Sequence, residues 1–290
     1  MQATLLTNLL LPLALGVIML GLGTGLTLED FRRVVRYPKA VLVGLCLQTL
    51  VLPWVAFGLA VGFGLAPPLA SGLMLLAASP GGATANIYSH LARGDVALNI
   101  TLTAINSLLC LLTMPLILDL SLQYFMDAGQ YVPPPVAKVV EAAAIVLLPV
   151  AAGMVVRHFA PGFVAASARP LRMFTVLVLV LLVAVAMAQS WQVLPGWIAV
   201  VGLACLLFNL ASLGCGYAVP VALGLPRPQS IAVSMEIGIH NSTLALFIAL
   251  NVLATPAMAI PAAVYSLVMF FTATVMAWWL NRGEPLPVPA

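Results

Sequence analysis

Charged side chains are scarce in this sequence. Asp, Glu, Lys and Arg make up 7% of its 290 residues, against roughly 25% in soluble domains, so a soluble globular class is excluded. Apolar runs of about 20 residues, the length of a helical membrane span, recur from end to end. The strict alternation of apolar and polar residues found in outer-membrane barrels is missing. The sequence therefore predicts an all-α polytopic membrane protein with a single transmembrane domain over residues 1–290.

Three further absences narrow the range of functions that this membrane protein can have. The four cysteines form no C-x-x-C pair and lie in apolar runs, which disfavours disulfide and zinc sites. No H-E-x-x-H, G-x-S-x-G or phosphate-loop motif is present, so we expect a protein that is not an enzyme. The first apolar stretch follows no basic residue and precedes no clear cleavage site. We therefore expect it to be a first membrane span and not a signal peptide.

Turn residues divide the apolar sequence into nine expected helices. Their ranges are 5–26, 39–62, 67–91, 95–123, 135–158, 170–190, 197–222, 229–253 and 258–281. Lys and Arg fall in every second connection, beginning with the first, and only Lys138 lies on the other side. Because cytoplasmic loops attract Lys and Arg, this pattern predicts an inner-membrane protein with its N-terminus outside and its C-terminus in the cytoplasm.

Two of the nine helices are interrupted by residues that suit a membrane helix poorly. The interruptions are SPGGATAN at 79–86 and MEIGIHNS at 235–242. Pro80 lacks an N–H group, and Gly81-Gly82 let the backbone unwind. The interrupted helices run in opposite directions and lie five helices apart, which predicts an inverted repeat of helices 1–4 and 6–9. Such matched breaks point to a transporter's binding site, although a packing kink would explain either one alone.

A small set of polar residues accompanies the breaks. Glu236 is the only acidic residue deep in a span, which makes it a functional-site candidate; a protonated Glu bonded to a neighbouring helix is the structural alternative. Asn99, Thr103 and Asn106 share one helix face, where ordinary interhelical hydrogen bonding would explain them alone. Together with Asn86 and Glu236 they form a set of oxygen ligands suited to a hard cation. Unwound carbonyl ends also suit cations, and helix N-termini suit anions.

These segments resemble the bile acid:sodium symporter family over nearly the whole chain, in its bacterial nine-helix form. The resemblance is carried by GLGTGLTLEDFRRVVRYPKA at 21–40, LQTLVLP at 47–53, SPGGATANIYSHLARGDVALNITLTAIN at 79–106 and MEIGIHNSTLALFIA at 235–249. It implies a core domain of about 39–123 and 197–281 and a panel domain of about 5–26 and 135–190. The two broken helices would cross in the core, and the two domains would provide alternating access.

The resemblance also implies two sodium sites behind the crossing. The first would use Asn86, Asn99, Thr103 and Glu236, with backbone help near Ala85. The second would use Gln48, Glu236, His240 and the carbonyl groups of Ile237 and Ile239. Three positions depart from the family pattern: Ala85 and Asn99 stand where many members have Ser, and His240 stands where many have Gln. An imidazole nitrogen is a less natural sodium ligand than an amide oxygen, and histidine can titrate near neutral pH.

Substrate contacts are expected at the crossing, from Pro80, Gly81, Gly82, Thr84, Asn241 and Ser242. Met269-Phe270 stand where some bile-acid-binding members have His-Asn, which favours a small carboxylate over a bile acid. The sequence thus predicts sodium-coupled uptake of an organic anion, with neither nucleic acid nor an obligate protein as partner. Three alternatives stay open: proton coupling through Glu236 and His240, a non-transporting receptor or sensor, and a channel.

Overall fold

The described part of the chain is built from helices. The computed structural model describes residues 11–82, 84–126, 136–189 and 194–282, and within these ranges the only strand-like pairing is a single bridge between Gly81 and His240. Four helical segments are long and apolar enough to cross a membrane: Pro38–Gly62, Val96–Phe125, Ala199–Ala222 and Pro256–Asn281. The expected all-α, multi-pass membrane class is confirmed at this level.

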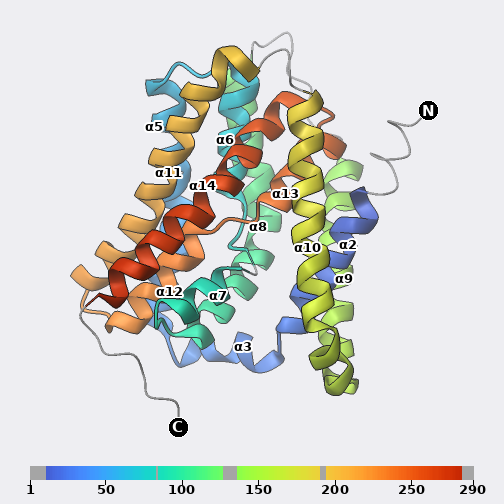
Figure 1. The fold of residues 1–290 in the computed structure, drawn as a ribbon, viewed down its shortest axis with the longest axis vertical. Coiled ribbons are helices and arrows are strands. Elements are labelled where there is room, and N and C mark those ends of the chain that lie inside the picture. Colours follow the sequence, from blue (N-terminus) through green and yellow to red (C-terminus); the bar gives the residue numbers. More distant parts are fainter. Residues whose placement is uncertain (1–10, 83, 127–135, 190–193, 283–290) are drawn as a thin grey trace.

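One group of three helices lies side by side at the right of Figure 1. It consists of α2 (Leu11–Gly25), α9 (Val136–Phe159) and α10 (Pro161–Gln189). Glycines set the close approach of α2 and α9, because a Cβ atom at Gly23 or Gly153 would collide with the backbone of the opposite helix. Arg157 of α9 also donates a hydrogen bond of 2.9 Å to the Thr24 carbonyl. Residues 5–10 of the expected first helix lie outside the described ranges.

The remaining membrane helices form a second group. Its members are α4 (Pro38–Cys46), η3 (Leu47–Val51), α5 (Leu52–Gly62), α6 (Pro67–Ala78), α7 (Ala85–Leu91), α8 (Val96–Phe125), α11 (Leu194–Ala222), α12 (Arg227–Gly238), α13 (Ser242–Phe247), η4 (Ile248–Val252) and α14 (Pro256–Asn281). The segments η3 and η4 are π-helical turns. In η3 the π-type turn precedes Pro53, which has no N–H to continue the ordinary ladder.

The helices α6 and α12 are built alike. Each has 12 residues and carries a proline in its first turn. Each follows a turn in which a glycine has a positive φ, 58° at Gly64 and 75° at Gly224. The residue before each helix has nearly the same backbone angles, φ −56° and ψ 144° at Ala66 against φ −56° and ψ 145° at Pro226. Both helices then end at a break, and the chain resumes as α7 or α13.

Two sequence expectations about helix bounds were wrong. The helix expected to start at 170 begins at Pro161, because a proline is favourable at the first helical position, and the helix then continues through Pro170. The basic connection after the first span is not a plain loop. It holds α3 (Leu28–Arg32) and η2 (Arg33–Val35), which run along the bottom of Figure 1 between the two groups.

A capping box fixes the start of α3. Asp30 accepts hydrogen bonds from the Thr27 N–H at 2.6 Å and from the Thr27 hydroxyl at 2.7 Å. The same carboxylate forms an ion pair of 2.6 Å with Arg33. The connection between the two groups is therefore an ordered helical turn with its own polar network.

Candidate ion and substrate site

The two broken segments meet and bond to each other. The Gly82 N–H donates to the Ile239 carbonyl at 2.7 Å, and the Asn241 N–H donates to the Pro80 carbonyl at 2.8 Å. These bonds form the antiparallel bridge between Gly81 and His240. Each unwound segment thus satisfies part of the other's backbone, as a membrane interior requires.

Glu236 lies at this crossing and is completely buried. The Thr103 hydroxyl donates to its Oε2 at 2.6 Å, and the Asn106 side-chain amide donates to its Oε1 at 3.2 Å. Gly81 packs against the carboxylate so closely that a Cβ atom there would collide with it. No ion pair joins Glu236 to a cationic side chain among the described residues. A buried carboxylate in this position needs a proton or a bound cation.

Unpaired amide oxygens occur on α7 and α8, the helices that pack against α12. The Oδ1 atoms of Asn86, Asn99 and Asn106 are buried and have no hydrogen-bond partner in the described part of the chain. The amide nitrogen of Asn99 is in use, since it donates to the Ala232 carbonyl at 2.8 Å. Unsatisfied buried acceptors are unfavourable unless a ligand fills them.

The donor set fits a hard alkali cation. It offers one carboxylate, amide oxygens and the Thr103 hydroxyl, all of them oxygen ligands. Zinc-type sites instead gather His and Cys, and the described residues contain no cluster of three or more His, Cys, Asp or Glu. The structure joins Thr103 and Asn106 to Glu236 by hydrogen bonds and Asn99 to the Ala232 carbonyl of the same helix as Glu236; Asn86 lies at the start of α7, which packs against that helix.

The residues expected at a second sodium site form hydrogen bonds with the broken segments. Gln48 donates its side-chain amide to the carbonyls of Ala77 at 3.1 Å and Ser79 at 2.9 Å. The Nδ1 atom of His240 lies 3.1 Å from the same Ser79 carbonyl. The Ile239 carbonyl already accepts the Gly82 N–H.

An open cavity lies where α2, the crossing and α14 meet. Four of the expected substrate residues line it: Gly82, Thr84, Asn241 and Ser242. Further lining residues come from other helices and from the second break: Ile18, Met19, Leu22, His240, Thr243, Met269 and Phe270. The α2 residues were not foreseen, because apolar side chains in an apolar span give no sign of which face meets a cavity.

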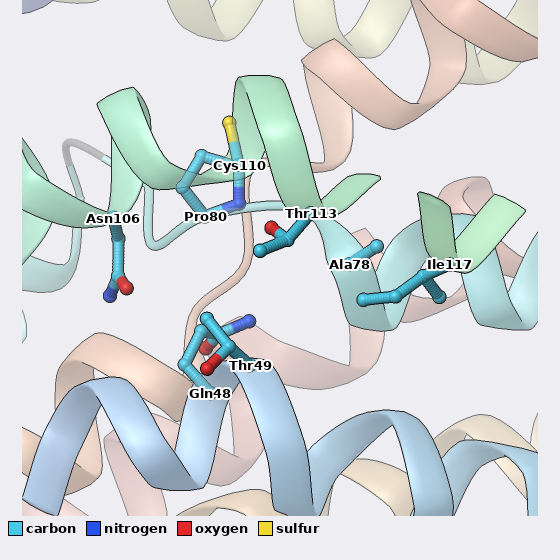
Figure 2. Close-up of a pocket in the computed structure, with 8 residues that line it drawn as sticks. All are labelled: Gln48, Thr49, Ala78, Pro80, Asn106, Cys110, Thr113 and Ile117. Atoms are coloured by element: carbon cyan, nitrogen blue, oxygen red, sulfur yellow. The ribbon is translucent and has the colours of Figure 1, made fainter. Parts of the chain in front are cut away.

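Two expected substrate residues do not line this cavity. Gly81 lies against Glu236 instead. Pro80 lines a smaller cavity, shown in Figure 2, between η3, the end of α6 and α8. Figure 2 shows Gln48 and Thr49 on one side of this space and Asn106 of α8 on the other. Polar groups are therefore present in two separate cavities beside the crossing.

Comparison with known proteins places the chain among membrane transporters. The model of the sodium bile acid symporter family matches residues 12–197. The probable sodium/metabolite cotransporter BASS2, chloroplastic, of Oryza sativa is 31% identical over 278 residues, which cover 95% of this chain and 65% of the relative. The sodium-dependent transporter YocS of Bacillus subtilis is 28% identical over 268 residues, covering 92% of this chain and 82% of the relative.

A third relative extends the match to the bile-acid transporters. The ileal sodium/bile acid cotransporter of Oryctolagus cuniculus is 26% identical over 236 residues, covering 81% of this chain and 67% of that protein. A symporter family also confirms the expectation of a transporter and not an enzyme. With a family match over most of its length and the crossing of two broken helices at its centre, the chain belongs to the sodium bile acid symporter family.

Proposed function

We propose that this protein is a sodium-coupled symporter that imports a small organic anion by alternating access. The observation that carries the proposal is Glu236, a fully buried carboxylate with no cationic partner in the described residues. Unpaired amide oxygens of Asn86, Asn99 and Asn106 belong to α7 and α8, the helices that pack against α12. Sodium is the transported ion here, and it would satisfy the charge and the oxygens together.

The geometry also supplies a way to couple ion and substrate. Thr84 lines the large cavity, while Asn86, two residues later at the start of α7, offers its unpaired oxygen on the ion side. On the other broken helix, Glu236 of α12 precedes Asn241 and Ser242 of the cavity wall. A sodium ion held by Asn86 and Glu236 would tie the first broken segment to α12, whose end is already held by Asn209 and Tyr265, so sodium binding preorganises the substrate site.

The cavity supports a small anionic substrate. No Asp or Glu is among the described residues that line it, and Thr84 and Ser242 bring hydroxyl groups to its wall. The Asn241 oxygen accepts the Leu244 N–H at 3.1 Å, which leaves the side-chain NH₂ as a donor. Hydroxyl and amide donors can hold a carboxylate. The apolar side chains of Ile18, Met19 and Leu22 would cover the rest of such a molecule.

The wider architecture belongs to the same proposal. We infer nine membrane spans in which helices 1–4 and 6–9 form an inverted repeat; the matched entry turns of α6 and α12 and their antiparallel bridge support it. The group of α2, α9 and α10 would be the panel, and the other helices would be the core. The basic connections would lie on the cytoplasmic side of the cell membrane, with the N-terminus on the outside.

The test measures first the stabilisation of the protein by sodium and then the uptake of substrate driven by sodium. In detergent, sodium should raise the melting temperature of the purified full chain relative to choline at equal ionic strength, and Glu236→Gln should abolish the rise. In proteoliposomes, a panel of mono-, di- and hydroxycarboxylates and one bile acid is screened for uptake driven by an inward sodium gradient. Sodium-independent stability together with sodium-independent uptake would overturn the proposal. Binding without flux for every substrate would favour a receptor, and flux that fails to saturate would favour a channel.

One observation keeps proton coupling as a second candidate. Glu236 lacks a cationic partner in the described residues, and a proton would neutralise it as a sodium ion does. His240 lies at the same crossing with its Nε2 atom unpaired. Uptake that rises at low external pH and ignores sodium would select this mechanism over the first.

A further inference from the structure

The connection from α2 to α4 lies across the ends of the membrane helices. In Figure 1, α3 runs along the bottom of the molecule, across the direction of α2, α9 and α10. Its inner side is fixed to the protein, because α3 packs against α8 and Asp30 is buried. Phe31, Val34 and Tyr37, which follow one another at intervals of three residues, pack against the hydrophobic core. One side of α3 and η2 is therefore held on the ends of the membrane spans.

The opposite side of α3 and η2, its outer face, is formed by Leu28, Arg32, Val35 and Arg36. Their intervals of four, three and one residues place them on one side of a helical segment. Leu28 is 70% exposed and Val35 is 85% exposed, and both arginines are exposed as well. Neither arginine forms an ion pair with another described residue. Exposed aliphatic side chains beside unpaired arginines are typical of a helix that lies in the membrane–water interface.

The charge around the outer face favours an anion. Lys39 is also exposed, and its ammonium group donates to the Leu223 carbonyl, which holds this third cation near the two arginines in the chain. Against these three cations the segment exposes one carboxylate, Glu29, because Asp30 is buried and paired with Arg33. A guanidinium group binds a phosphate through parallel N–H donors. The apolar and cationic side chains together match an amphipathic anion better than a free phosphate.

We propose that the outer face of α3 and η2 binds an anionic phospholipid. Leu28 and Val35 enter the boundary of the acyl chains, and Arg32 and Arg36 hold the phosphate of the headgroup. The bound lipid keeps the connection between the two helix groups at the membrane surface while the groups move. The inference depends neither on the transported ion nor on the substrate, so it can fail while the proposed function stands.

Native mass spectrometry of the purified full chain tests the selectivity for an anionic lipid. The chain is released from micelles that contain equal amounts of phosphatidylglycerol and phosphatidylcholine, and the retained lipids are counted. We expect preferential retention of phosphatidylglycerol, reduced about fivefold by Arg32→Gln and again by Arg36→Gln. Arg169→Gln is the matched control, because this arginine of α10 is also exposed. Equal retention of the two lipids by the unaltered chain, or an equal loss in Arg169→Gln, would overturn the proposal.

A tryptophan at position 35 tests where the lipid binds. Because Val35 is 85% exposed, Val35→Trp disturbs little packing. In proteoliposomes of phosphatidylcholine with a minor share of phosphatidylglycerol, its fluorescence is measured after subtraction of the signal of the unaltered chain. We expect stronger quenching when bromine atoms are on the phosphatidylglycerol than on the same share of phosphatidylcholine, and choline chloride should weaken this preference by screening. Quenching by neither lipid, or equal quenching by both, would contradict the proposal.

Discussion

The two breaks at the crossing follow helices of equal length, yet they are held in different ways. After α12 the Gly238 carbonyl accepts from Asn209 at 2.8 Å and from Tyr265 at 2.9 Å. Asn209 and Tyr265 are 2.8 Å apart, and Thr272 donates to the Asn209 oxygen. Every polar atom of this network has a partner, so the second break is a closed structure.

The first break, in contrast, is surrounded by open polar atoms. Oε1 of Gln48 and Oδ1 of Asn86 lack hydrogen-bond partners in the described residues, whereas at the second break the unpaired side-chain atom is Nε2 of His240, outside the network of Asn209 and Tyr265. The two breaks therefore differ in role. The backbone of the second break is held in place by side-chain hydrogen bonds, whereas the first break carries unpaired atoms that an ion can bind. The single carboxylate, Glu236, comes from α12, and α6 contributes no corresponding acidic residue.

The largest effect is expected from a methyl group placed between the two breaks. In Gly81→Ala the new Cβ would collide with the Glu236 carboxylate, which must then leave its position between Thr103 and Asn106. We expect loss of sodium-dependent stabilisation in a thermal-shift titration. Gly58→Ala is the matched control, because a Cβ there meets nothing within 4 Å. A Gly81→Ala protein that titrates like the unaltered one would disprove the placement of the ion.

Opening the closed network should reduce stability without changing the sodium response. Asn209→Leu removes the contacts to Gly238, Tyr265 and Thr272. At about 0.6 kcal/mol for each interhelical hydrogen bond, the free energy of unfolding should fall by about 2 kcal/mol. Unfolding curves should shift equally in sodium and in choline. A shift confined to sodium would mean that the second break also responds to the ion.

A smaller and ion-specific change is expected at the first break. Asn86→Ala removes one unpaired oxygen, and we expect sodium affinity to fall about tenfold, or 1.4 kcal/mol. Asn251→Ala is the control, because the amide of Asn251 in η4 is also buried and unpaired but lies in a segment outside the candidate ion site. Equal sodium affinities of the two variants would show that Asn86 is not a ligand of the ion.

The smallest effect is expected from Tyr265→Phe. The change keeps the ring against Phe208 and His240 and removes the hydroxyl's bonds to Gly238 and Asn209. Asn209 still bonds the Gly238 carbonyl, so stability should fall by about 1.2 kcal/mol for the two lost bonds. Denaturant titrations in sodium and in choline measure it; a sodium affinity reduced more than threefold would show that the support and the ion site are not separable.

Part of this site can be predicted from the sequence because polar residues stand out against an apolar background. Glu236, Asn99 and Thr103 are conspicuous for that reason, and Pro80-Gly81-Gly82 mark a break by their backbone chemistry. The partners of the second break were not foreseen. Asn209 was indistinguishable from an ordinary interhelical hydrogen-bonder, since pairing across helices depends on packing that no local pattern encodes.

Other features of the fold were hidden for similar reasons. The cavity wall on α2 is made of Ile18, Met19 and Leu22. In the sequence such apolar residues are the same whether they face lipid, the protein core or a cavity. Pro161 lies between the expected helices 135–158 and 170–190 but begins a helix, and the sequence alone does not distinguish the two cases because proline both ends and begins helices. The engagement of His240 with Ser79 required knowing that the two broken segments bridge each other.

Hydrogen exchange of the full chain in sodium and in choline tests the central claim most directly. The account predicts that sodium slows amide exchange in α7, which begins beside Asn86, while exchange in α13 and η4 stays unchanged because their break is already closed by Asn209 and Tyr265. Equal protection of both segments, or protection of α13 alone, would contradict the claim that the ion is held at the first break.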